Sequence, residues 1–286
     1  MPQLRRDGFP SRLLLAGLVL LFGIGPAAAG RKPQRVVSIN LCADQLLLAL
    51  ADREQIASLS PLVRDRSISF LADRAEGLPV NGGKGEAILF SGADLVLVGP
   101  FERHVRADML QRQGLRVMVL DPWQSLDQGR EQIRMLADRL GHPERGEALI
   151  AEIEAALRRA KAVVPDRPSI LTYYRNGWVP ASNSLVSEVL QHMGFSLHQD
   201  AIGLSSGGGA RLESIVVRPP DFMLMDDAAG RAVDNGTALL VHPALARSVP
   251  WKRRLTVPGR LMICGGPSTP AAIDALREEA EAKLRR

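Results

Sequence analysis

Residues 143–164, PERGEALIAEIEAALRRAKAVV, decide the fold that we predict for this chain. Pro143 suits the first position of a helix, where its missing N–H costs nothing, and Pro165 ends the pattern. Apolar residues recur every three or four positions and form one stripe: Leu149, Ile153, Ala156, Ala160 and Val163. At ~1.5 Å per residue the helix is about 33 Å long. Because strand and helix patterns lie on both sides of it, we interpret it as a connector between two lobes.

Short apolar strands alternate with helices before and after the connector. The predicted strands are 35–40, 56–60, 94–98, 116–120, 169–173, 221–225 and 261–264. The other predicted helices are 44–51, 86–91, 103–113, 126–140, 184–193, 212–217, 243–247 and 270–284, and 205–209 is a glycine-rich loop. Such alternation forms parallel sheets with helices on both faces. We expect an α/β fold of two Rossmann-like lobes, residues 30–141 and 166–286, joined by one long helix at 142–165.

An internal repeat supports two equivalent lobes. EAILFSGADLVLV at 86–98 matches ESIVVRPPDFMLM at 213–225. Each has a Glu, a one-turn apolar helix, a breaker, and then an Asp with an apolar strand. Glu86 and Glu213 are either simple helix-start acids favoured by the helix dipole or a matched pair of exposed anions for a partner with two-fold symmetry.

The N-terminal residues 1–29 have the pattern of a signal peptide. Three arginines precede an apolar run at 13–24, and Ala27-Ala28-Ala29 forms an A-x-A cleavage signal. The run is shorter than the ~20 residues of a membrane span, although an uncleaved anchor is the alternative. We expect cleavage after Ala29 and export to a bacterial periplasm, by the Sec route or, as Arg5-Arg6 hints, the twin-arginine route.

The composition excludes several function classes. The 286 residues are 46% hydrophobic and 23% charged, as in a soluble globular protein. The net charge is +5, and acidic and basic residues are interspersed along the chain, without the basic stripe of a nucleic-acid-binding protein. The five histidines lack metal-ligand spacing, and no G-x-S-x-G elbow marks a serine hydrolase. We therefore expect no catalytic residues, no metal site and no intrinsic cofactor.

The landmarks, in this order, resemble periplasmic binding proteins of bacterial ABC importers for cobalamin, iron–siderophore and heme-type ligands. They are RVVSIN at 35–40, GGKGEAILFSGADLVLVG at 82–99, the connector, NSLVSEVLQHMGF at 183–195 and RLESIVVRPPDFMLMD at 211–226. The resemblance covers the chain from Arg35 onward. It implies two comparatively rigid lobes and a small ligand between them. It also implies that Glu86 and Glu213 dock onto arginine pockets of the two permease subunits. We expect a monomer.

The ligand cleft is expected at the carboxyl ends of the strands, where α/β sheets bind ligands. Many of the scarce aromatic residues follow those ends, and the turn 173–178, YYRNGW, is too polar to be buried. The predicted ligand-binding residues are Asn40, Cys42, Pro61, Leu62, Arg64, Phe101, Arg103, Trp123, Tyr173, Tyr174, Arg175, Trp178 and Cys264. Arg64, Arg103 and Arg175 suit carboxylates or catecholates. The region after Pro61 departs from the family's aromatic-rich loop, which weakens the case for cobalamin and leaves room for an anionic siderophore complex.

Cys42 and Cys264 follow strand ends in different lobes, and three interpretations stay open for them. They are buried thiols, a disulfide permitted by an oxidising compartment, or ligand contacts. For the whole chain we predict a non-enzymatic binding protein that captures an iron–siderophore, cobalamin or similar metal chelate. One alternative is an exported α/β enzyme that uses Asp226 or Asp227 as its acid or base. Another is an envelope interaction or chaperone-like protein without a small ligand.

Overall fold

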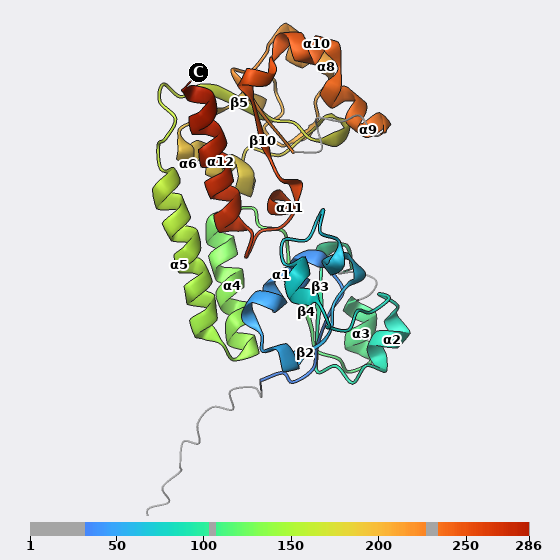
Figure 1. The fold of residues 1–286 in the computed structure, drawn as a ribbon. Coiled ribbons are helices and arrows are strands. Elements are labelled where there is room, and N and C mark those ends of the chain that lie inside the picture. Colours follow the sequence, from blue (N-terminus) through green and yellow to red (C-terminus); the bar gives the residue numbers. More distant parts are fainter. Residues whose placement is uncertain (1–31, 103–106, 227–233, 286) are drawn as a thin grey trace, which may run out of the picture. The chain divides into compact units, whose positions relative to one another are not determined.

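The computed structural model describes residues 32–102, 107–226 and 234–285 (Figure 1). The predicted signal peptide, Arg103 and Asp227 therefore lie outside the described residues. Among the helices that are described, none combines the length and the apolar character needed to cross a membrane.

The first sheet has four parallel strands in the order β2-β1-β3-β4. Its strands are β1 (Val36–Ser38), β2 (Ile56–Ser58), β3 (Leu95–Val98) and β4 (Val117–Val119). Its helices are α1 (Leu41–Leu50), α2 (Gly85–Leu89), α3 (Asp108–Arg112) and α4 (Leu126–Leu140). Every residue of β1 and β3 is buried, and all of them except Ser38 are apolar, as expected for strands of a parallel sheet that is covered on both faces.

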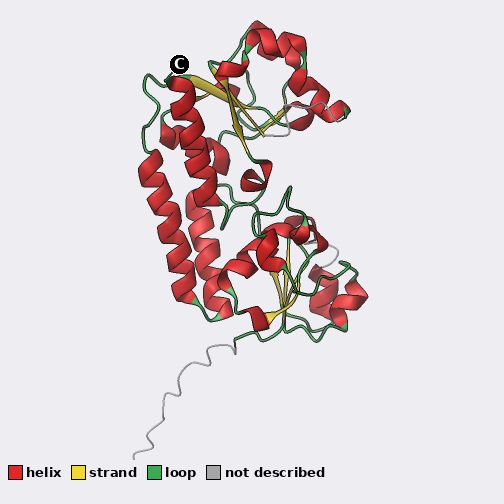
Figure 2. Cartoon of the chain, viewed as in Figure 1, coloured by secondary structure: helices red, strands yellow, loops and turns green. Residues whose placement is uncertain are grey.

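The second sheet has four parallel strands in the order β10-β9-β5-β7. They are β5 (Ser169–Thr172), β7 (Ser196–Leu197), β9 (Phe222–Asp226) and β10 (Arg254–Val257). The helices are α6 (Leu185–Met193), α7 (His198–Ala201), α8 (Leu212–Val217), α9 (Asn235–Ala238), α10 (Pro243–Ser248), α11 (Gly259–Met262) and α12 (Thr269–Leu284). In Figure 2 the strands of each sheet lie beside helices, as the predicted α/β class requires.

Short 3-10 helices connect the regular elements of both sheets. They are Arg53–Gln55, Pro61–Arg64, Ala72–Ala75, Pro100–Glu102, Arg175–Gly177, Leu239–Val241 and Trp251–Arg253. We call the elements up to α4 the first half of the protein, and those from β5 onward the second half.

The two sheets have equivalent strand orders, and the internal repeat occupies the same register in each. Val36 pairs with Leu95 in the first sheet and Ile170 with Phe222 in the second. Just before each of these pairs, an aspartate accepts a backbone N–H from the neighbouring strand's start. Asp94 accepts from Arg35 at 3.1 Å, and Asp221 accepts from Ser169 at 2.8 Å. The repeat read from the sequence is therefore a structural repeat.

The connector helix α5 (Pro143–Ala160) is shorter than the predicted 143–164. The helical backbone ends because Lys161 is extended, with a ψ of 120°, and Ala162 after it has a positive φ of 50°. The N–H groups of Ala162 and Val164 donate instead to the carbonyls of His192 and Met193, at 3.1 and 2.9 Å. The last predicted turn is lost because these residues pair with the end of α6.

Helix α5 lies beside α4 and α12 (Figure 1). Its apolar stripe belongs to a buried core that also includes Leu136 of α4 and Leu276 of α12. A Cβ at Gly146 would lie 2.7 Å from the Cβ of Ala137, so the close approach of α4 and α5 requires glycine there. One core thus includes residues of both halves, while the lobe boundaries at 141 and 166 stay predictions.

The predicted strand 261–264 is wrong, because the fourth strand of the second sheet is β10. Pro258 follows β10 and cannot donate a ladder hydrogen bond. The N–H of Leu261 donates to the carbonyl of Pro258 at 2.9 Å, so the apolar run begins as the helical turn α11. The loop prediction at 205–209 is also partly wrong, since Gly208–Gly209 forms β8, antiparallel to β6 (Trp178–Val179).

Candidate functional site

A cavity of about 630 Å³, which we call the apolar pocket, is lined by residues of both halves. The first half contributes Asn40, Cys42, Leu62, Phe101 and Trp123 among others. The second half contributes Tyr174, Val186, Val189, Met262 and Cys264 among others. A mostly apolar wall with a few polar groups is typical of a small-molecule site.

A neighbouring cavity of about 730 Å³, the arginine pocket, carries charged groups. Arg66, Arg260 and Asp226 line it. Arg66 also pairs with Asp73 at 2.7 Å. The two pockets adjoin, because four residues line both of them: Ile68, Tyr174, Met262 and Ile263. A ligand with an apolar body and an anionic edge would find suitable chemistry in the two pockets together.

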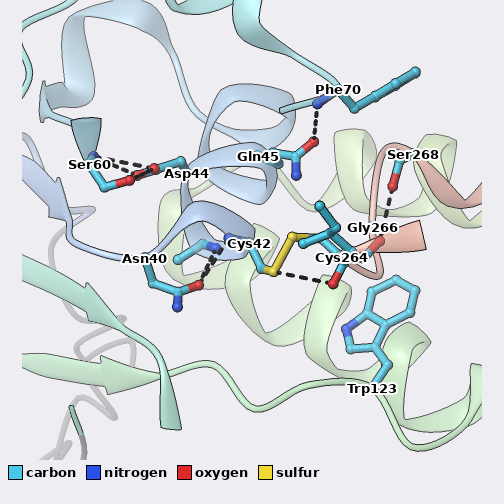
Figure 3. The surroundings of a disulfide bond; sticks show 12 residues. Asn40, Cys42, Asp44, Gln45, Ser60, Phe70, Trp123, Cys264, Gly266 and Ser268 are labelled. Atoms are coloured by element: carbon cyan, nitrogen blue, oxygen red, sulfur yellow. Dashed lines mark hydrogen bonds between the residues drawn. A yellow bond between two sulfur atoms is a disulfide. The ribbon is translucent and has the colours of Figure 1, made fainter. Parts of the chain in front are cut away.

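Asn40 places the first turn of α1 in the wall of the apolar pocket. It is the N-cap residue, and its side-chain oxygen accepts the N–H groups of Cys42 and Ala43 at 2.9 and 3.3 Å (Figure 3). This bond satisfies donors that a helix start leaves unpaired. The predicted ligand residue Asn40 therefore also fixes the backbone that presents Cys42.

Cys42 and Cys264 form a disulfide with Cα atoms 5.2 Å apart (Figure 3). Of the three interpretations of these cysteines, the disulfide is the one found, and both residues also line the apolar pocket. Ser268 donates its hydroxyl to the carbonyl of Cys264 at 3.0 Å, which fixes the segment after α11. The bond joins the first half to the second in the wall of the pocket.

Trp123 is buried in the wall of the apolar pocket, between two glycines. A Cβ added at Gly129 or at Gly265 would lie 2.4 Å from an atom of its indole ring. The indole N–H donates to the Gln132 side chain at 2.9 Å, and Gln132 donates to the carbonyl of Asp121 at the same distance. Glycine at 129 and 265 and the amide of Gln132 thus hold the ring in one orientation.

Asp44 is a fully buried carboxylate behind this wall, on α1. It accepts the N–H of Ser60 at 3.1 Å and also the Ser60 hydroxyl (Figure 3). Burial raises the pKa of Asp44 to about 6, although hydrogen bonds from Ser38 and Ser60 act in the opposite direction. These bonds tie α1 to the turn that begins at Pro61 and carries the pocket residue Leu62.

Tyr174 lies where the two pockets meet. Burial raises the pKa of its phenol well above the ordinary value, and the nearby Asp226 carboxylate adds to the shift. The group is therefore a neutral phenol at physiological pH. A neutral phenol at this position can donate a hydrogen bond.

A sequence model of the family described as periplasmic binding protein matches residues 36–249. The chain belongs to the periplasmic binding protein family. A cobalamin-binding protein of Halobacterium salinarum is 23% identical over 227 residues, which are 76% of this chain. This chain spans about 60% of the length of that curated relative.

Solved structures that share the fold of this periplasmic binding protein include the following three. The apo heme-binding protein RhuT of Roseiflexus sp. RS-1 has a TM-score of 0.70 at 22% identity, over 88% of this chain and 98% of that one. A possible iron-binding protein of Staphylococcus epidermidis has a TM-score of 0.67 at 14% identity, over 90% of this chain and 100% of that one. A periplasmic heme-binding protein of Pseudomonas aeruginosa has a TM-score of 0.66 at 21% identity, over 86% of this chain and 91% of that one. At such identities the likeness establishes the two-sheet α/β fold.

The predicted ligand residues of this family member divide into two groups. Those that line the apolar pocket are Asn40, Cys42, Leu62, Phe101, Trp123, Tyr174 and Cys264. Those that line neither pocket are Pro61, Arg64, Tyr173, Arg175 and Trp178. Arg103 lies outside the described residues.

The two arginines of the second group have other partners in the structure. Arg64 donates to the carbonyl of Leu78 at 2.8 Å, and Arg175 pairs with Asp234. Tyr173 has no exposed surface, so its expected position at the cleft is corrected: it packs in the core of the second half. Trp178 is 55% exposed, on β6. The predicted trio of arginines is thus not assembled by the described residues, and Arg66 and Arg260 supply the pocket's guanidinium groups.

Sequence reasoning did not select several residues of the pockets. Val186 and Val189 lie three apart on α6, and this helical spacing was a usable signal. Met262 belongs to the segment 261–264 that was misassigned as a strand, and Arg260 immediately precedes it. Asp226, the candidate acid of the enzyme alternative, lines the arginine pocket, whereas Asp227 lies outside the description.

Glu86 and Glu213 are exposed at the second residue of α2 and of α8. Glu213 has Arg211 at 3.8 Å, both side chains being mostly exposed. Across the described residues, no group of three or more His, Cys, Asp or Glu side chains has the geometry of a metal site.

Proposed function

We propose that this chain is the solute-binding component of an ABC import system. It captures a metal chelate in the apolar pocket and presents it to an inner-membrane permease. The observation that carries the proposal is a pocket with walls from both halves of a periplasmic binding protein. The proposed class of ligand and the proposed permease partner follow from that assignment and from the chemistry of the pocket walls.

The pocket chemistry supports an iron–siderophore, a cobalamin or a similar chelate as ligand. Both volumes lie in the range of about 300–1,000 Å³ that is usual for small-molecule sites. Trp123 and Tyr174 offer apolar faces with a polar edge, and Arg66 and Arg260 suit carboxylates or catecholates. The ligands named for a relative and for a structural neighbour, cobalamin and heme, are metal chelates of the same kind.

The proposed protein is a carrier and not an enzyme, and it needs no cofactor of its own. Binding a chelate asks for a shaped wall and a few polar contacts, which the two pockets supply. We further propose that residues 1–29 direct export to the periplasm with cleavage after Ala29, and that the mature carrier is a monomer. The exported-enzyme alternative predicts turnover, which a carrier would lack.

Docking to the permease is assigned to Glu86 and Glu213. Each is an exposed acid at the same position of an equivalent short helix, so a two-fold permease could receive one at each subunit. Exposed charges of this kind determine partner choice and orientation more than they determine affinity.

The carrier assignment is tested by the visible absorption spectrum of protein purified from its native periplasm. We expect visible absorption from a bound chelate, and removal of that chelate should leave the protein folded. In the same host, the double variant Glu86→Arg/Glu213→Arg should abolish uptake while ligand affinity is unchanged. Glu152→Arg, an exposed charge reversal on α5, is the matched control and should retain uptake. Loss of affinity in the double variant would contradict docking.

A further inference from the structure

The internal repeat extends beyond its sequence pattern to the exposure of each side chain. In the first copy, Glu86 is exposed, Ile88 is 1% exposed and Phe90 is 89% exposed. In the second copy, Glu213 is exposed, Ile215 is 0% exposed and Val217 is 85% exposed. Each short helix therefore anchors itself by one isoleucine and presents one acid and one large apolar side chain to solvent.

The acid and the apolar side chain belong to the same face of each helix. They are four residues apart, and residues at that spacing are neighbours on a helix surface. In the first copy, the N–H of Phe90 donates to the carbonyl of Glu86 at 3.1 Å, which closes this turn. In the second, both residues lie inside α8. We call Glu86 with Phe90 and Glu213 with Val217 the two acid–apolar pairs.

The two pairs occupy equivalent places in the fold. Helix α2 leads into β3, and α8 leads into β9, which is the same strand position in the second sheet. Asp94 and Asp221, eight residues after the respective acids, make the same kind of hydrogen bond to a neighbouring strand. A partner that contacts both pairs in the same way must itself offer two equivalent contact points.

Neither pair serves the ligand or the core. Phe90 and Val217 line neither the apolar pocket nor the arginine pocket. Large apolar side chains left almost wholly in water gain nothing from the hydrophobic effect until a partner covers them. Fully covering a Val or Phe side chain contributes about 1.5–3 kcal/mol, which is more than about tenfold in affinity.

We propose that each acid–apolar pair is one contact unit for the permease, so that the permease offers, on each of two equivalent subunits, a cationic side chain beside an apolar hollow. This inference rests on the proposed docking function and adds Phe90 and Val217 to it. The acid selects a cation by charge complementarity, and the apolar side chain supplies the binding energy that an exposed ion pair lacks.

The test begins with photo-crosslinking in the native host, using the full-length chain. A benzophenone amino acid replaces Phe90 in one variant, Val217 in a second and Met135 in a third. Met135 is the matched control, an apolar side chain of α4 that is 49% exposed and lies outside the repeat. We expect crosslinks from positions 90 and 217 to the same integral membrane subunit of an importer, and none from position 135. Crosslinks to a second copy of this chain, to two unrelated proteins or to nothing would overturn the proposal.

The second measurement is affinity for the permease found in this way, reconstituted in lipid nanodiscs. Phe90→Ser and Val217→Ser should each weaken the dissociation constant about tenfold or more, while Met135→Ser leaves it unchanged. The swap Phe90→Val/Val217→Phe should bind within about threefold of wild type, because a two-fold partner offers the same hollow to both. Serine variants that bind as wild type would overturn the inference.

The charge-reversal variants separate the inference from the function on which it rests. If Glu86→Arg/Glu213→Arg abolishes permease binding and the serine variants do not, docking stands and the apolar contact is wrong. If neither set of variants affects permease binding, the docking assignment itself is wrong. Affinity for the small-molecule ligand should be the same in all of these variants, since none of the changed residues lines a pocket.

Discussion

Cys42 and Cys264 are separated by 222 positions in the sequence, yet a disulfide joins them in the wall of the apolar pocket. Cys42 lies in the first turn of α1, beside the first sheet, and Cys264 follows α11, after the last strand of the second sheet. The bond therefore closes a loop that contains nearly all of both sheets. It restrains the two halves at the place where they share a ligand site.

Breaking this bond should lower the stability of the whole protein. A disulfide that closes so long a loop contributes about 2–5 kcal/mol, mainly by restricting the unfolded chain. We expect that loss in urea unfolding of Cys42→Ser/Cys264→Ser, and a similar loss when reductant is added to the wild type. Reductant should not change the unfolding of the double variant. Equal stability of the oxidised wild type and the double variant would contradict this role.

Asp44 should make stability depend on pH in the acidic range. Its pKa is about 6 in the folded protein, against 3.8 for an ordinary aspartate. Between those values the folded protein binds the proton more tightly than the unfolded chain, so the contribution of Asp44 to the free energy of unfolding falls as pH rises. The fall amounts to about 3 kcal/mol and is complete above pH ~6.

The pH prediction is tested by comparing the wild type with Asp44→Asn in urea unfolding between pH 4 and pH 7. Other acids, such as Asp221, have a lowered pKa and contribute stability that is lost as pH falls, so the difference between the two proteins is the quantity to measure. The wild type should lose stability relative to the variant as pH rises. A difference that is constant with pH would contradict the assigned pKa.

Gly265→Ala should destabilise the pocket wall. The new Cβ would lie 2.4 Å from the ring of Trp123, which has Gly129 on another side and cannot shift without disturbing its bond to Gln132. Overpacking of this kind costs about 1–3 kcal/mol. Gly82→Ala is the matched control, because nothing lies within 4 Å of its Cβ position, and it should change stability little. Unfolding of both variants by urea decides the matter, and equal effects would contradict the packing described.

Much of the fold could be predicted because local signals agreed with tertiary structure. Helix α4 was predicted to the residue, since its N-cap Ser125 and its C-terminal Gly141 in the left-handed conformation bound a clear apolar stripe. The end of α5 could not be predicted, because it depends on hydrogen bonds from Ala162 and Val164 to a segment thirty residues away. Nothing local to the apolar run at 261–264 showed that the last strand of the second sheet is formed by β10 and not by this run.

The candidate site was predicted less completely, for a physical reason. Residues that follow strand ends, such as Asn40 and Tyr174, reach the pocket because the strands fix them there. Long arginine side chains are not fixed by their backbone positions. Arg64 and Arg175 turn to Leu78 and Asp234, and Arg66 and Arg260 line the pocket instead. Sequence alone does not reveal such choices between partners.

The most direct test of the carrier account is titration of the ligand-free mature protein with cobalamin, heme and a panel of ferric siderophores. Tryptophan fluorescence and calorimetry measure the binding during each titration. The account predicts that one of these chelates binds with 1:1 stoichiometry and a dissociation constant of about 1 μM or below. Tyr174→Ala should weaken that binding about tenfold or more, and Trp178→Ala, at a position that lines neither pocket, should weaken it less. Absence of binding by every chelate, or binding that Tyr174→Ala leaves unchanged, would contradict the account.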